Sequence, residues 1–81
     1  MDFQFHPDAL LEFKAEVAYY EEARPGFGAA FSERVLNAVE LACLFPTIGS
    51  PEGDGVRSLV TRQFPFLVFY EVIGDRVWFG R

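Results

Sequence analysis

The chain has 81 residues, a length that accommodates one domain with one hydrophobic core. Because 51% of the residues are hydrophobic and 17% are aromatic, the composition excludes a disordered chain or a low-complexity repeat. The formal net charge of −5 disfavours direct binding of free nucleic acid, since that binding depends on basic side chains that neutralise phosphates. The sequence contains no apolar run of membrane-spanning length and no secretory signal, so we expect a cytoplasmic protein without membrane contact.

Residues that usually hold metals or cofactors are scarce. Cys43 is the only cysteine and His6 the only histidine, which excludes an internal disulfide, a cysteine-rich zinc site and a histidine-based triad. The glycines between residues 49 and 55 precede a predicted strand rather than a helix, so they do not form a phosphate-binding loop. We therefore expect no metal and no cofactor.

The first half of the chain predicts a strand and two helices. Asp2–Phe5 alternates polar and apolar residues, as a short strand does. Apolar residues then recur every three or four positions over 8–24 and again over 28–44, which predicts two amphipathic helices. Pro25 and Gly26 separate them, so they form an antiparallel helical hairpin.

The second half predicts a loop and a three-stranded antiparallel meander. Residues 46–55 are rich in proline and glycine and indicate a surface loop. Strands are predicted over 56–63, 66–73 and 76–79, with Gly74 and Asp75 as a two-residue turn. The expected fold class is α+β, a single domain over residues 1–81 in which one antiparallel sheet carries the helical hairpin. The last strand ends next to Arg81, which leaves a truncated C-terminus open.

The third predicted strand is apolar on both of its faces. Two helices cover only one face of a sheet, so the other face should carry an apolar patch rimmed by arginine, of the kind that binds another chain. Shielding by the edge strands and the long loop is the alternative interpretation. The residues we expect to bind a partner are Phe66, Val68, Phe69, Tyr70, Trp78 and Phe79.

Arginines of the second half are the remaining candidates for chemistry. Arg57, Arg62 and Arg81 could hold a scissile phosphate, and Tyr70 could stack on a base. The alternative is that these arginines pair with acids in this chain or in a partner.

Three segments of the sequence together resemble a known toxin group. They are HPDALLEFKAEVAYYEEARPGFGAAFSERV, FPTIGSP and GVRSLVTRQFPFLVFYEV, and they cover nearly the whole chain. The chain thereby resembles the RelE/ParE superfamily of toxins from bacterial type II toxin–antitoxin systems. The resemblance implies a strand, a helical hairpin and a sheet, and a cognate antitoxin that wraps the toxin.

The resemblance implies one of two activities, both of which inhibit growth. ParE-like members inhibit DNA gyrase and are associated with plasmid stabilisation, whereas RelE-like members cleave mRNA on the ribosome. In the RelE-like case Arg57, Arg62 and Arg81 match the basic residues of the nuclease site. This chain is acidic and has one lysine, which favours gyrase inhibition without enzymatic activity. The alternatives are a ribosome-dependent mRNA endonuclease and a non-toxic interaction module.

Overall fold

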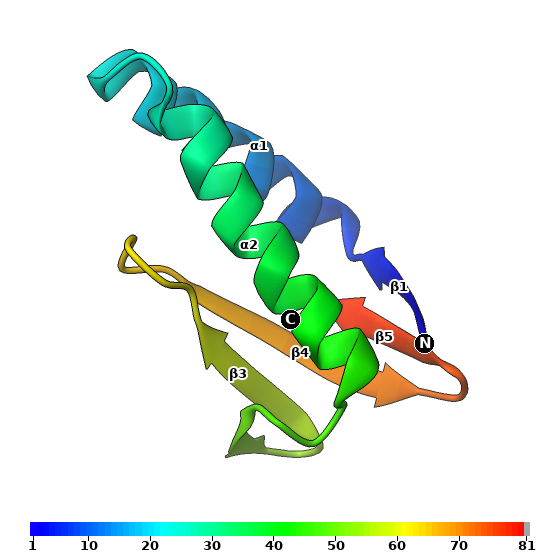
Figure 1. Cartoon of the computed structure of the whole chain (residues 1–81). Coiled ribbons are helices and arrows are strands. Elements are labelled where there is room, and N and C mark those ends of the chain that lie inside the picture. The colour runs from blue at the N-terminus through cyan, green and yellow to red at the C-terminus, as the bar shows by residue number, and fades with distance from the viewer. Residues whose placement is uncertain (81) are drawn as a thin grey trace.

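The structure is a computed structural model that describes residues 1–80. Two helices follow a first strand, and four further strands complete one sheet (Figure 1). The helices and strands span β1 Asp2–Phe5, α1 Pro7–Ala23, α2 Phe27–Leu44, β2 Ser50–Gly53, β3 Val56–Val60, β4 Leu67–Ile73 and β5 Arg76–Phe79. The predicted α+β class, with an N-terminal strand, a helical hairpin and a C-terminal meander, is confirmed.

The hairpin between the helices is fixed by a carboxylate that caps the second helix. Gly26 precedes α2 in a left-handed conformation, with φ at 91°. The Glu21 carboxylate, from the end of α1, accepts the N–H groups of Gly26 and Gly28 at 3.0–3.2 Å. Free N–H groups and the positive end of the helix dipole favour a negative charge there. A Cβ at residue 28 would lie 2.8 Å from the Val17 carbonyl oxygen, so glycine lets the helices approach closely.

The sheet is mixed, which corrects the expectation of a wholly antiparallel sheet. Its strand order is β1-β5-β4-β3-β2. β5, β4, β3 and β2 pair antiparallel in turn, but β1 pairs parallel with β5, with Phe5 opposite Phe79. The two-residue turn at Gly74 and Asp75 is confirmed. Alternating residues identify a strand but carry no information on the direction of its neighbour.

The segment over residues 46–63 differs from the prediction in two places for local reasons. β3 ends at Val60 rather than at residue 63, because the Thr61 hydroxyl donates to the carbonyl oxygens of Phe64 and Phe66 and closes a turn. The proline- and glycine-rich segment contains the edge strand β2, which pairs with β3 and has a register shift between Pro51 and Gly53. An edge position tolerates proline because one side of the strand makes no ladder hydrogen bonds.

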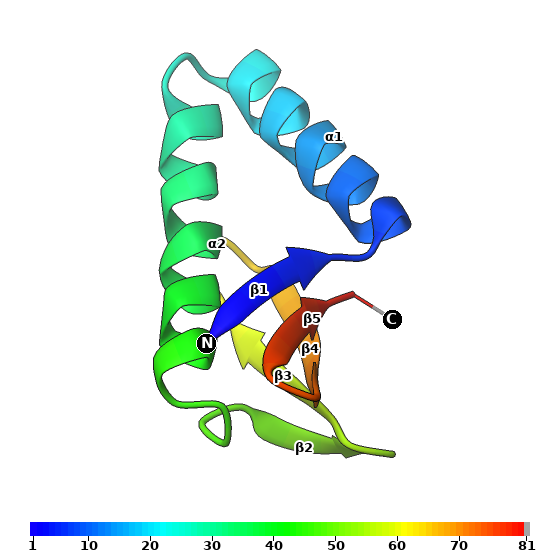
Figure 2. The same ribbon diagram turned by 90° about the vertical axis from the view of Figure 1, so that its right-hand side faces the viewer.

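The two helices relate differently to the sheet. Figure 2 shows that α2 runs beside the sheet along its C-terminal half, while α1 rises away from the end of β1 and meets α2 beyond the sheet. Six residues of α2 are buried, whereas α1 has no buried residue. The buried apolar core comprises Phe31, Val35, Ala38, Val39 and Ala42 of α2 with Phe64, Val68, Tyr70, Val77 and Phe79.

Neither α1 nor α2 combines the length and the apolar character that crossing a membrane requires.

Candidate functional site

Tyr70 and Arg57 together hold the loop that follows α2. The Tyr70 hydroxyl donates to the Pro46 carbonyl oxygen and accepts the Gly49 N–H, both at 2.9 Å. The Arg57 Nη1 donates to the carbonyl oxygens of Thr47 at 3.1 Å and Gly49 at 2.8 Å. Tyr70 is 0% exposed and lies opposite Arg57 in the β3–β4 register. Both side chains therefore satisfy backbone groups of the chain itself, and Tyr70 has no surface on which a base could stack.

The other candidate arginines lie elsewhere. Arg62 is exposed in the turn after β3, where it lines a small cleft with Arg34 of α2. Arg57, by contrast, bonds the loop after α2 and does not line that cleft. Arg81 lies outside the described residues. The structure thus does not bring Arg57 and Arg62 together.

The six residues expected to bind a partner divide into two groups. Val68, Tyr70 and Phe79 belong to the buried core and are at most 5% exposed. Phe66 packs edge-on against Phe31 of α2, with ring centroids 5.0 Å apart. The remaining two, Phe69 and Trp78, are half-buried.

The sheet face opposite the helices is largely apolar, with Glu71 of β4 between Phe69 and Ile73 on the same face. Val60, Leu67 and Ile73 are 69%, 47% and 51% exposed, and the strand register places Phe69 and Trp78 on the same face. We call these five residues the open-face patch. Arg76 lies opposite Ile73, so a guanidinium borders the patch as predicted.

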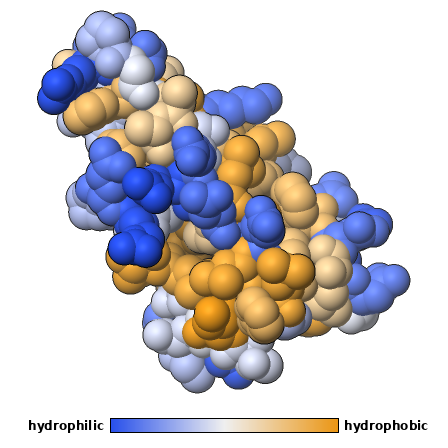
Figure 3. All heavy atoms as spheres, in the orientation of Figure 1, coloured by the Kyte–Doolittle hydropathy of each residue, from blue (hydrophilic) through white to orange (hydrophobic). Residues whose placement is uncertain are grey.

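A second group of exposed apolar side chains surrounds the C-terminal end of α2. Figure 3 shows apolar side chains gathered there, beyond hydrophilic ones over the middle of the helix. The amphipathic pattern of the helix did not single out this group, because its members fall at the helix end and in the following loop. They are Leu41, Leu44, Phe45 and Ile48.

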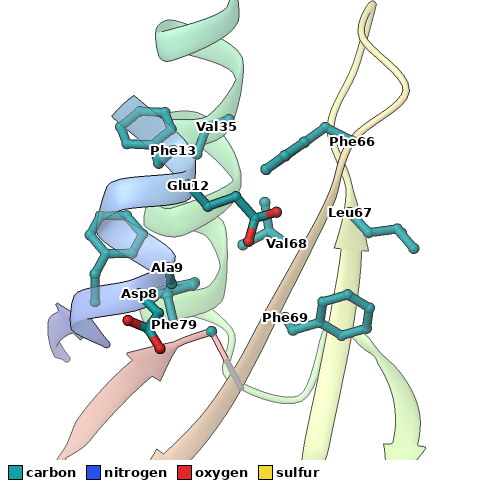
Figure 4. Close-up of a pocket in the computed structure, with 12 residues that line it drawn as sticks. Asp8, Ala9, Glu12, Phe13, Val35, Phe66, Leu67, Val68, Phe69 and Phe79 are labelled. Atoms are coloured by element: carbon teal, nitrogen blue, oxygen red, sulfur yellow. The ribbon is translucent and has the colours of Figure 1, made fainter. Parts of the chain in front are cut away.

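A cleft of about 350 Å³ separates the start of α1 from β4. Figure 4 shows Asp8 and Glu12 of α1 on one side of it and Phe66 and Val68 on the other. We call this hollow the α1–β4 cleft. It remains open because α1 leans away from the sheet. Its lining comprises Phe5, Asp8, Ala9, Glu12, Phe13, Val35, Phe66, Leu67, Val68, Phe69, Phe79 and Gly80.

Sequence reasoning missed this cleft. Asp8 and Glu12 lie one helical turn apart, a spacing typical of any solvated helix face, and we interpreted Glu12 in that way. Phe13, the residue after Glu12, packs against Phe5 and Phe31. Only the angle of α1 against the sheet reveals the hollow, and periodicity does not encode that angle.

Cys43 lies near the end of α2 and is half-buried. The pKa of the Cys43 thiol is raised, mainly because partial burial disfavours the charged thiolate. The nearby N-terminal ammonium acts to lower this pKa, and Asp2 acts to raise it. Cys43 is therefore less nucleophilic than a free cysteine. Among residues 1–80, no three histidine, cysteine or carboxylate side chains are grouped as metal ligands. The His6 ring instead packs on Trp78, with centroids 5.1 Å apart.

Comparison with known proteins identifies the family. A search of curated proteins found no match. Residues 3–81 match the family model described as the ParE toxin of the type II toxin–antitoxin system parDE. The match covers nearly the whole chain and agrees with the observed order of strand, helical hairpin and meander. The chain therefore belongs to the ParE toxin family of type II toxin–antitoxin systems.

Proposed function

We propose that this chain is a growth-inhibiting toxin that acts on DNA gyrase by protein contact and is neutralised by a cognate antitoxin. Membership of the ParE toxin family supports this target. The observation that carries the mode of action is the open-face patch, which combines three exposed aliphatic side chains with Phe69 and Trp78. Exposed apolar surfaces with aromatic residues are typical of protein-binding sites.

The positions of Arg57 and Tyr70 support contact rather than RNA cleavage. Both are engaged with the loop after α2, so neither is available to hold a phosphate or a base without loss of those bonds. Among the expected nuclease residues in the described chain, that leaves Arg62 alone at the surface.

The test is induced expression of the full chain in a bacterial host, with gyrase-linked DNA breaks and protein synthesis measured in parallel. We expect DNA breaks to accumulate before translation falls. Codon-phased mRNA cleavage with early loss of translation would instead indicate the ribosome-dependent nuclease. An absence of any growth effect would indicate a non-toxic interaction module.

Surface variants assign the effect to the open-face patch. Val60→Lys and Ile73→Lys place a charge in the patch at exposed positions, so the fold should tolerate them. We expect each to reduce growth inhibition about tenfold, whereas Leu11→Lys, at a 66% exposed leucine of α1, should not. Arg62→Ala should retain toxicity; its loss of toxicity would contradict the proposal.

A further inference from the structure

Glu71 places a carboxylate within the open-face patch. It lies on β4 two residues from Phe69 and two from Ile73, so all three share one face of the sheet. The β4–β5 register puts Glu71 directly opposite Trp78. Figure 4 shows the side chains of Leu67 and Phe69 on this face directed away from α1. A protein that covers the patch therefore also covers Glu71.

The Glu71 carboxylate is half-buried and has no partner in the described chain. No residue within 1–80 donates a hydrogen bond to it or forms an ion pair with it. Arg76 lies on the same face, opposite Ile73. Its Nη1 donates to the Gln4 Oε1 of β1 at 3.0 Å, and β1 flanks β5 on the side away from β4. The guanidinium at the border of the patch is thus turned away from Glu71.

A partner that covers the patch has to satisfy this charge. Water solvates the carboxylate while the face is open, but a contacting surface displaces that water. Burying a charge without a partner opposes binding, whereas an opposite charge with hydrogen bonds offsets that penalty. A wholly apolar partner is therefore a poor match. The matching surface has a cation where Glu71 lies and apolar side chains around it.

The surroundings of Glu71 favour arginine as that cation. Side chains directly opposite one another in a sheet, as Glu71 and Trp78 are, have Cβ atoms about 5 Å apart. The His6 ring packs on Trp78, but His6 follows β1, on the other side of β5 from β4. A guanidinium paired with Glu71 through two N–H groups would lie beside the indole, on which its planar group can stack. An ammonium lacks this planar fork.

We propose that the open-face patch recognises a basic segment of the target, in which an arginine pairs with Glu71 beside Trp78. Apolar residues next to that arginine contact the aliphatic side chains of the patch. The net charge of −5 also favours the approach of a basic surface. This inference rests on the proposed function, since it takes gyrase as the protein that covers the patch.

The first experiment uses Glu71→Leu to separate this arrangement from purely apolar contact. If the patch bound by apolar contact alone, removal of a half-buried charge would strengthen binding. We expect instead that purified gyrase binds Glu71→Leu about tenfold less tightly than wild type, and Glu71→Lys less tightly still. Glu33→Leu makes the same change at an exposed position of α2 and should bind like wild type. Circular dichroism checks that the variants fold.

The salt dependence of gyrase binding is a second readout of the same ion pair. Binding of wild type should weaken more steeply with salt than binding of Glu71→Leu, because salt screens charge interactions. Unchanged or tighter gyrase binding by Glu71→Leu would overturn the inference. So would concentration-dependent dimerisation of the wild-type chain, measured by sedimentation, that Glu71→Leu abolishes, since a second copy would then cover the patch.

The second experiment tests the site without gyrase. A displayed library of random peptides is selected against the full wild-type chain, and only peptides that lose binding to Ile73→Lys are kept. We expect these peptides to carry arginine beside apolar residues and to bind Glu71→Leu about fivefold less tightly. A selection that yields no such arginine-bearing peptides would overturn the inference. Failure of gyrase to bind the wild-type chain would instead contradict the proposed function, and the peptide measurement would still test Glu71.

Discussion

The two helices of the hairpin are nearly equal in length but unequal in burial. α1 has 17 residues and α2 has 18, and both show apolar residues at helical spacing. Six residues of α2 are buried and none of α1 is. The comparison teaches that an amphipathic pattern predicts which face of a helix turns inward, but not whether the chain itself fills the space on that side.

The largest effect expected from this difference is on core stability. Phe31 of α2 is fully buried, so Phe31→Ala should lower the free energy of unfolding by about 3–5 kcal/mol. Phe13→Ala should cost less than about 2 kcal/mol, because Phe13 of α1 is only half-buried and borders the open cleft. Urea unfolding of both variants measures the two values. Equal losses would show that α1 is held as firmly as α2.

A smaller effect concerns the connection between the end of α2 and the sheet. Tyr70→Phe removes the hydroxyl that bonds Pro46 and Gly49 and should cost about 1–3 kcal/mol, since a buried N–H is left without a partner. Tyr19→Phe, on the exposed side of α1, should change the free energy of unfolding by less than about 0.5 kcal/mol. If the two variants unfold at the same urea concentration, Tyr70 does not hold the loop.

The smallest expected effect concerns the link between the helices. Glu21→Gln removes the negative charge that faces the start of α2 and should destabilise the chain by about 0.5–1 kcal/mol. Glu22→Gln makes the same change without those contacts and serves as the control. The difference should shrink in high salt, which screens charge interactions. A difference that does not depend on salt would argue against the dipole contribution.

Much of the fold follows from the sequence because its periodicity is strong. The helices, the Gly74 turn and the strand near residues 67–73 were predicted to within a few residues. The parallel pairing of β1 and the strand β2 were not predicted. Both depend on which segment lies alongside in space, and β2, with the sequence SPEG, has no apolar alternation of its own.

The candidate site was less predictable because exposure depends on tertiary packing. The two-sided apolar character of β4 predicted an exposed patch, and Leu67 and Ile73 are exposed on that face. The same pattern placed Phe69 and Tyr70 on opposite faces but did not tell which face the helices cover, and Tyr70 is the one that is fully buried. Likewise an arginine in a strand looks the same in sequence whether it binds phosphate or, like Arg57, carbonyl groups of its own loop.

Amide hydrogen exchange under native conditions tests most directly whether α1 is packed less stably than α2. The account predicts that amides around Phe13 and Val17 exchange through local opening, at free energies well below that of global unfolding. Amides around Phe31 and Val35 of α2 should exchange only when the whole chain unfolds. Equal protection of the two helices in the isolated chain would contradict the account.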